Sequence, residues 1–417
     1  MAFFVPRVAK FIIKSTEDNN QLSNSNYKEK LWTKDFISTS IVNLALTLSM
    51  YLLLVTMAIY AMNEYDASMS MAGFVASIFV IGALVGRIYA GKQVAYTGGK
   101  KMLLIGATLV FIVTFLYFLP LGLYGLIIIR FLHGVMIGVA TTATGTIVAQ
   151  VIPASRSGEG IGYFSMSVVM ATAIGPLIGV MLITNIGFTS VFVFSFVMSA
   201  ISLLLSLTLR PPKVTKSEKP KNASFSLSDY YEKCALPVST IMFVMAFAYS
   251  SILSFVTGYA QEINLVQAGS LFFLVYGVTV LLSRPITGPL MDKKGANVVI
   301  YPAIISFAFG MIVISQAYAG IVLLIAAALL GLGYGNIQSI IQARAIKMTP
   351  RENMGLANST YFIALDLGLG LGPLLLGYLI PISGYRGMYL LLVIVILAGM
   401  VLYHFMHGRV DKKLIDS

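Results

Sequence analysis

The sequence predicts an all-α integral membrane protein with twelve transmembrane helices in two parallel six-helix repeats. Three observations support this fold class: a very apolar composition, twelve apolar runs of membrane-spanning length, and Gly, Pro and Arg positions that recur at one fixed offset. Of the 417 residues, 58% are hydrophobic and only 11% are charged. About a quarter of the residues of an ordinary soluble domain are charged. Because a soluble protein could not bury so much apolar surface, the composition excludes a soluble enzyme.

The apolar runs have the length and number that twelve spans require. A helix needs about 20 apolar residues to cross the hydrocarbon layer. Polar segments at 1–34, 210–233 and 408–417 leave room for six spans at 35–209 and six at 234–407, so we expect an N-terminal tail, two six-helix bundles joined by a linker, and a C-terminal tail. The spans are predicted to begin near Asp35, Met69, Met102, Gly122, Ile161, Phe188, Cys234, Gln267, Asn297, Gly320, Leu356 and Gly387.

The distribution of Lys and Arg predicts the orientation. An even number of spans puts both termini and the 210–233 linker on one side, and most of the 28 Lys and Arg residues fall on that side. Basic residues concentrate in cytoplasmic loops, so both termini are expected in the cytoplasm, here of a bacterial plasma membrane. The same bias accounts for the net charge of +12 without a nucleic-acid partner.

An internal repeat is the most informative feature of the sequence. A shift of 197 residues superposes Arg87 on Arg284 and Gly91 on Gly288. The same shift aligns Gly98 with Gly295, Gly134 with Gly331, Gly138 with Gly335, Pro153 with Pro350, Gly175 with Gly372 and Pro176 with Pro373. Because six spans is an even number, the two copies have the same orientation. This is the parallel repeat of alternating-access transporters.

Three motifs resemble those of a known family. The loop after the second span carries Gly91, Gln93, Ala95, Gly98, Gly99 and Lys100, and its second copy carries Gly288, Leu290, Asp292 and Gly295. The fourth span contains Arg130-Phe-Leu-His133-Gly134, and the fifth contains Ala171, Gly175, Pro176 and Gly179. In these motifs the chain resembles the major facilitator superfamily from end to end, and within it the twelve-span proton-coupled drug exporters of bacteria.

The resemblance implies a gating role for the loop motifs. The glycines Gly91 and Gly288 suit places where two spans turn or touch closely. Asp292 is expected to help close the cytoplasmic side, with Arg284 as its partner, whereas Ala95 cannot do so in the first half. An anchoring role for Asp292 in its loop stays open. The predicted gating set also includes Arg87 and the Gly175-Pro176 and Gly372-Pro373 pairs, which are expected to interrupt their helices.

Buried charge predicts the proton-coupling group. Asp366 is the only acid in the middle of a span, and its repeat counterpart is Val169, so the fold of a half does not demand a carboxylate there. A carboxylate at that depth is costly unless it is protonated or paired, which suits a group that exchanges protons. Arg130 and His133 are the other candidates, the first through the family resemblance and the second as a relay that titrates near neutral pH. Simple hydrogen-bonding roles stay open for Asp366 and His133.

Polar faces on four spans predict the substrate cavity. In the family, spans one, four, seven and ten surround a central cavity. The polar residues that we expect there are Asn43, Thr47, Tyr51, Tyr249, Ser254, Gln338 and Gln342. Few charges and many aromatic and Met residues suit amphipathic compounds, cations among them.

The predicted function is proton-driven efflux of small amphipathic compounds of the multidrug type, by alternating access. Export of a secreted metabolite or a metal-chelating molecule, and nutrient uptake by proton symport, are the alternatives, and the Gly-Pro motif of the fifth span counts against uptake. The chain contains one Cys, three His and no phosphate-binding loop, so neither a metal site nor a cofactor is expected. The expected partners are a small molecule, protons and the lipid bilayer, and the protein is expected to be monomeric.

Overall fold

The computed structural model describes residues 30–212 and 230–408, and regular structure in these ranges is entirely helical. Twelve of the described helices are long and apolar enough to cross a membrane. The first six are α2 (Lys34–Tyr65), α3 (Met69–Thr97), α4 (Gly99–Leu116), α5 (Gly122–Val151), α6 (Ser157–Asn185, preceded by η1 at Ala154–Arg156) and α7 (Phe188–Thr208). The twelve-span prediction is therefore confirmed.

The second six spans follow in the same order. They are α8 (Leu236–Glu262), α9 (Val266–Lys294), α10 (Asn297–Ser315), a tenth span described below, α13 (Met354–Gly377, preceded by η4 at Arg351–Asn353) and α14 (Ile380–Tyr403, extended by η5 at His404–Gly408). The tenth span consists of α11 (Gly320–Leu330), a π-helical turn η3 (Gly331–Gly335) and α12 (Asn336–Lys347). Eleven spans begin within four residues of the expected positions. The twelfth begins at Ile380 rather than near Gly387, because a short turn precedes a break at Gly384, where φ is 66°.

Local sequence signals explain several helix ends. Thr33 and Ser68 are the N-caps of α2 and α3, and each hydroxyl accepts a hydrogen bond from a backbone N–H of the first turn. Gly98 and Gly295 end the second and eighth spans with φ of 85° and 84°. These two glycines are repeat counterparts, and a residue with a side chain rarely adopts that conformation. The fixed offset in the sequence therefore corresponds to a repeated backbone turn.

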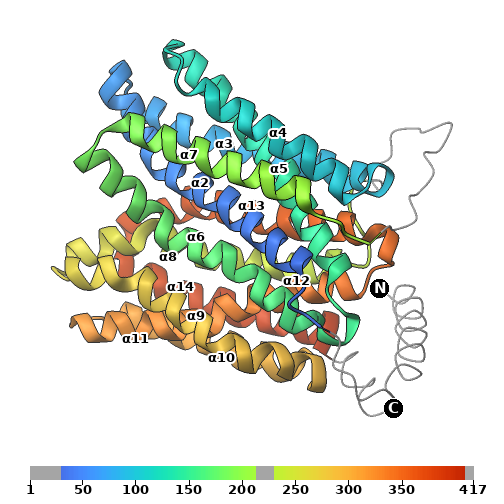
Figure 1. Cartoon of the computed structure of the whole chain (residues 1–417). Helices are drawn as coiled ribbons and strands as arrows, with labels where there is room; N and C mark the ends of the chain where they lie inside the picture. The colour runs from blue at the N-terminus through green and yellow to red at the C-terminus, as the bar shows by residue number, and fades with distance from the viewer. Residues whose placement is uncertain (1–29, 213–229, 409–417) are drawn as a thin grey trace.

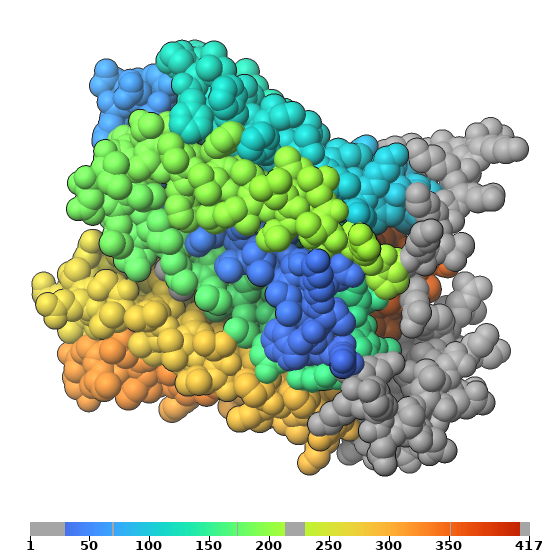
Figure 2. All heavy atoms as spheres, in the orientation of Figure 1, coloured from blue at the N-terminus to red at the C-terminus, as the bar shows by residue number. Residues whose placement is uncertain are grey.

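The spans pack mainly within their own repeat. In the first repeat, α5 packs against α3 and α4, and α2 packs against α6 and α7; in the second, α13 packs against α8, and α14 against α10. Figure 1 shows α2 to α7 along one side of the molecule and α9 to α11 along the other. Figure 2 shows the blue-to-green and yellow-to-orange parts as two adjoining blocks.

Both repeats begin and end at the same end of the helix bundle, which we call the linker end. There the Asp35 carboxylate accepts from the Arg210 backbone N–H at 2.8 Å, and the Asn353 side-chain amide donates to Glu232 at 3.0 Å. Many large apolar side chains on the outer faces are exposed, among them Ile128, Leu204 and Ile394. A membrane-spanning helix presents such a surface to lipid.

Two helix pairs join the repeats. The contacts are made by α3 with α13 and by α6 with α9, which are counterparts of each other under the internal repeat. α12 also contacts α6, and α5 contacts α13. The site described next lies along these interfaces.

Candidate functional site

An ion pair joins the repeats in the middle of the bundle. The Arg87 Nε on α3 donates to the Asp366 Oδ2 on α13 at 2.6 Å. The Arg87 Nη1 also donates to the Thr141 hydroxyl on α5 at 3.2 Å, and its guanidinium carbon lies 4.5 Å from the centre of the Phe362 ring. The side chains of Arg87 and Asp366 are only 6% and 15% exposed. Asp366 lies mid-span as the sequence indicates, but its partner is Arg87, which was predicted only as a gating residue.

Arg284 holds the equivalent place on α9 and has different partners. Its Nη2 donates to the Ser165 hydroxyl on α6 at 3.0 Å and to the Gly335 carbonyl at 2.9 Å. Its Nη1 donates to the Ser339 hydroxyl and to the Asn336 side-chain carbonyl. All four acceptors are neutral, and the buried Nε has no hydrogen-bond partner among the residues that the structure describes. The two repeats therefore place an arginine at the same position. In the first repeat it pairs with an acid, and in the second its described partners are all neutral.

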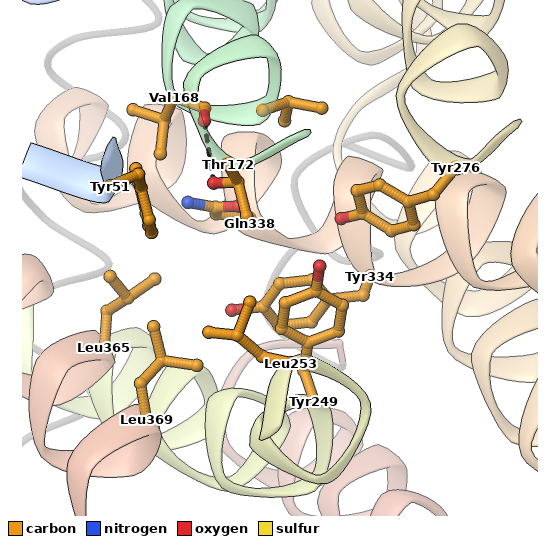
Figure 3. A pocket seen from close by; sticks show the side chains of 11 residues that line it. Tyr51, Val168, Thr172, Tyr249, Leu253, Tyr276, Tyr334, Gln338, Leu365 and Leu369 are labelled. Carbon is orange, nitrogen blue, oxygen red and sulfur yellow. Dashed lines mark hydrogen bonds between the residues drawn. The ribbon is translucent and has the colours of Figure 1, made fainter. Parts of the chain in front are cut away.

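A small cavity lies between the two repeats at this level. It is lined by Tyr51, Val168, Val169, Thr172, Tyr249, Leu253, Tyr276, Tyr334, Gln338, Leu365 and Leu369. In Figure 3 the Tyr276 hydroxyl points toward Gln338, Leu365 and Leu369 lie on the side away from Tyr276, and Leu253 lies beside Tyr249 and Tyr334. The free space is about 20 Å³, which is room for about one water molecule. A drug-sized ligand needs several hundred Å³, so the repeats must move apart before one can bind.

Three of the seven predicted substrate residues line the cavity, namely Tyr51, Tyr249 and Gln338. The others lie elsewhere. Within the first repeat, the Asn43 side chain donates a hydrogen bond to the Ser167 hydroxyl and accepts one from the Thr144 hydroxyl. The Thr47 hydroxyl donates to the Asn43 backbone carbonyl on its own helix. The other two are Gln342, which donates to the Asn358 side chain at 2.9 Å, and Ser254, which is exposed.

Two tyrosines of the cavity were not predicted from the sequence. Tyr334 stacks on Tyr249 with ring centres 3.8 Å apart, and it lies in the π-helical turn η3. That turn changes the helical register, and π-helical turns are frequent at functional sites. Tyr276 lies eight residues before Arg284 on one face of α9, a spacing that could have linked it to the buried cation. The wall of the cavity is thus more aromatic than the polar faces alone indicated.

At the linker end, Asp292 joins the last turn of α9 to the first turn of α6. Its two carboxylate oxygens accept from the backbone N–H groups of Gly158 and Glu159 at 2.7 and 2.9 Å. The expected partnership with Arg284 is wrong: Arg284 lies about 12 Å away along the helix and bonds Asn336 and Ser339 of α12. Free N–H groups at a helix start attract a carboxylate.

Glycines allow the same two interfaces to close. A Cβ on Gly288 would lie 2.6 Å from the Cα of Glu159, and one on Gly91 would collide with Ser359. The Ser359 hydroxyl donates to the Arg87 carbonyl at 2.7 Å. In the first repeat, Ala95 is the counterpart of Asp292 and provides no carboxylate for the start of α13. The interface of α3 with α13 therefore lacks the cap that the interface of α6 with α9 possesses.

The Gly-Pro pairs do not interrupt their helices, because α6 continues through Pro176 and α13 through Pro373. Their glycines serve close packing instead. Gly175 lies against Tyr51 and Leu52, and Gly372 lies against Ser250.

Arg130 and His133 form a separate buried cluster. The Arg130 Nε donates to the Val75 carbonyl at 3.3 Å, and its guanidinium carbon lies 4.6 Å from the centre of the Phe79 ring. The His133 Nδ1 pairs with the Tyr117 hydroxyl at 3.1 Å, and within the described part of the chain its Nε2 has no hydrogen-bond partner. Thr141, which contacts Arg87, lies about two turns further along α5. The structure therefore does not bring Arg130 or His133 next to Asp366.

Comparisons with known proteins agree with this architecture. The family model described as Major Facilitator Superfamily matches residues 39–359 and 238–415. The multi-drug resistance efflux pump PmrA of Streptococcus pneumoniae serotype 4 is 28% identical over 298 residues, which cover 66% of this chain and 71% of the pump. The staphylopine export protein of Staphylococcus aureus Mu50 is 23% identical over 80% of this chain and 87% of its own. The crystal structure of the human organic anion transporter MFSD10 aligns with a TM-score of 0.73 at 13% identity, covering 88% of this chain and 98% of that one.

Proposed function

The chain belongs to the major facilitator superfamily, and from this premise we propose that it exports small amphipathic compounds in exchange for protons, with Asp366 as the proton-carrying group. The observation that carries the proposal is the Arg87–Asp366 ion pair, which joins the two repeats next to the cavity. Leu365, which precedes Asp366, lines that cavity. A proton that enters the cavity thus has a short path to the carboxylate. The outward direction is supported by likeness to an efflux pump and an export protein.

The geometry suggests how protonation drives the exchange. Three hydrogen bonds between the repeats, made by Asp292, Arg284 and Ser359, lie between the cavity and the linker end, so that end is closed in this conformation. A proton arriving from the far end neutralises Asp366 and removes the ionic attraction to Arg87. The interface of α3 with α13 then loses its main polar contact, and the linker end opens. When the compound has bound, Asp366 releases its proton on that side and the ion pair closes the interface again.

We place the linker end in the cytoplasm, because the linker side carries most of the Lys and Arg residues. The cycle above then exchanges an incoming proton for an outgoing compound. A reporter fused at residue 220 tests this orientation. A cytoplasmic signal supports it, and an external signal contradicts both the orientation and the direction of transport.

The test of proton coupling is transport by everted membrane vesicles against a panel of compounds, with and without a pH gradient. Asp366→Asn removes the titrating group and nearly preserves shape, so gradient-driven transport should be lost while exchange of substrate without net proton movement continues. Glu262→Gln is the matched control, since Glu262 is an exposed acid at the end of α8. Asp366→Glu should retain part of the activity at a different optimal pH. Normal gradient-driven transport by Asp366→Asn would overturn the coupling role and leave Arg130 and His133 as the remaining candidates.

A second candidate is export of one secreted metabolite or metal-chelating molecule, supported by the likeness to the staphylopine export protein. The compound panel separates the two candidates. Transport of many unrelated compounds indicates a multidrug exporter, and transport of a single compound indicates a dedicated one. Accumulation in place of extrusion would instead indicate nutrient uptake.

A further inference from the structure

Arg284 is a buried cation to which the described part of the chain supplies no acid. It is 2% exposed, and its four hydrogen-bond acceptors are two serine hydroxyls, one amide side chain and one backbone carbonyl. Under the internal repeat, the residue that corresponds to Asp366 is Val169, so the second arginine has an apolar residue at the position that provides the carboxylate for Arg87. A buried charge with only neutral partners is costly, and an opposite charge relieves that cost.

The register of three helices places the Arg284 guanidinium directly on the linker side of the cavity. On α6 it bonds Ser165, about one turn before the cavity residues Val168 and Val169. On the tenth span it bonds Gly335 and Ser339, next to the cavity residues Tyr334 and Gln338. On its own helix it follows Tyr276, which lines the cavity from the same face. Arg284 therefore lies next to the cavity-lining residues, on the linker side of the cavity.

The charge balance of the bundle interior is positive. The charged residues that lie at least eight residues from either end of a described span are Arg87, Arg130, Arg284 and Asp366. With one acid against three arginines, two positive charges have no counter-charge in the middle of the described spans. A positive interior repels cations and attracts anions. This balance argues against the cationic compounds that the sequence alone allowed.

Opening of the cavity also exposes a donor on Arg284. The present cavity admits about one water molecule, so a ligand must bind after the repeats have moved apart. Ser165 belongs to the first repeat, whereas the other three acceptors belong to the second. Separation of the repeats thus frees the Arg284 Nη2 from Ser165, beside an Nε that already has no partner. Adjacent Nε and Nη2 donors are the pair that binds a carboxylate in a bidentate manner.

We propose that the transported compounds are amphipathic carboxylates, whose charged group pairs with Arg284 while the apolar body occupies the cavity. The leucines Leu253, Leu365 and Leu369 provide the apolar wall, and the tyrosines supply hydroxyl donors around it. The transport of these compounds rests on the proposed function. Their binding does not, because it follows from the charge and position of Arg284.

The experiment compares three probes with one apolar body: naphthylacetate, its neutral amide naphthylacetamide, and the cation naphthylethylamine. Binding to the full chain in nanodiscs is measured by calorimetry at neutral pH, with empty nanodiscs as the blank. We expect the carboxylate to bind at least about tenfold more tightly than the amide, and the amine most weakly. Equal affinity for the carboxylate and the amide, or tighter binding of the amine, would overturn the proposal.

Three variants assign the preference to Arg284. Arg284→Gln should remove the difference between carboxylate and amide, and Arg284→Lys should retain part of it. Val169→Asp should also remove it while leaving Arg284 in place, because the new carboxylate pairs with the arginine internally. The matched control is Arg386→Gln, which removes a positive charge that donates to the Ala317 carbonyl, away from the cavity. A carboxylate preference that survives both Arg284→Gln and Val169→Asp would contradict the assignment.

The same probes separate this inference from proton coupling. If the carboxylate binds but a pH gradient does not move it, the assignment of carboxylate binding to Arg284 stands and the proposed function fails. If a gradient moves only the neutral or cationic probe, the proposed function stands and the inference fails.

Discussion

Arg87 and Arg284 occupy the same position in the two repeats, but their surroundings differ. Arg87 pairs with Asp366 on the opposite repeat, and its guanidinium lies over the Phe362 ring. Arg284 also reaches the opposite repeat, where it finds the hydroxyl of Ser165, the counterpart of Phe362. At the linker end the asymmetry is reversed: the interface of α6 with α9 has the Asp292 cap, and the interface of α3 with α13 has Ala95. Each interface therefore has one carboxylate, at a different depth.

This difference indicates that the two interfaces have different functions. The α3–α13 interface carries its acid in the middle of the bundle, where a change of protonation alters the attraction between the repeats. The α6–α9 interface carries its acid at the linker end, where it binds two backbone N–H groups. A symmetric pair of interfaces would respond to a proton equally on both sides. The observed arrangement predicts that protonation acts directly on the α3–α13 interface, and that the α6–α9 interface separates only as the repeats then move apart.

The largest expected effect comes from removing first one and then both members of the Arg87–Asp366 ion pair. Arg87→Gln leaves Asp366 buried without its cation, and breaking one side of a buried pair costs about 3–5 kcal/mol. We expect thermal unfolding of the purified protein to show a large loss of stability for Arg87→Gln and a partial recovery when Asp366→Asn is added. Gradient-driven transport should be absent in both variants. Additive losses in the double variant would show that the two residues are not energetically coupled.

The next effect tests whether the acid can move to the other repeat. Combining Asp366→Val with Val169→Asp should restore an ion pair, now between α6 and α9 and next to Arg284. We expect the double variant to recover most of the thermal stability that Asp366→Val alone loses, because both the new acid and Arg284 gain a partner. Transport should stay low, because both carboxylates then hold the same interface and α3 loses its ionic contact with α13. Recovery of gradient-driven transport would show that the two interfaces are mechanically equivalent.

The sequence predicted which positions of the two repeats correspond and how deep they lie, but not which side chains contact each other. The depth of Asp366 and the equivalence of Arg87 and Arg284 follow from hydropathy and the fixed offset. The pairing of Arg87 with Asp366 depends on which helices face each other between the repeats, and span order does not determine that. Tyr334 was missed because the π-helical turn η3 shifts its direction, and Gln342 was misassigned because Asn358 takes its amide. Asn43 and Thr47 are polar residues that bridge helices, a use that periodicity cannot distinguish from cavity lining.

A smaller effect concerns the cap at the linker end. Asp292→Asn weakens the interaction with the α6 N-terminus by about 1 kcal/mol, which changes the ratio of closed to open molecules several-fold. Ala95→Asp gives the start of α13 a carboxylate and should shift the ratio the opposite way. Spin labels at Lys101→Cys and Lys293→Cys, in a Cys234→Ser background, report the distance across the linker end because both lysines are exposed there. Shifts in the same direction would contradict the capping role.

The smallest effect is expected in the cluster around His133. Its Nδ1 is hydrogen-bonded to Tyr117, its other nitrogen is buried with no hydrogen-bond partner among the described residues, and about two turns of α5 separate it from the contact between Thr141 and Arg87. We therefore expect His133→Asn and Tyr117→Phe to change the rate of gradient-driven transport less than about twofold, because neither group exchanges a proton with Asp366. The measurement is the initial rate in everted vesicles across a range of pH, normalised to the amount of inserted protein. A relay through His133 would instead make both variants slow and shift the pH dependence of His133→Asn, and it would move the coupling site into the first repeat.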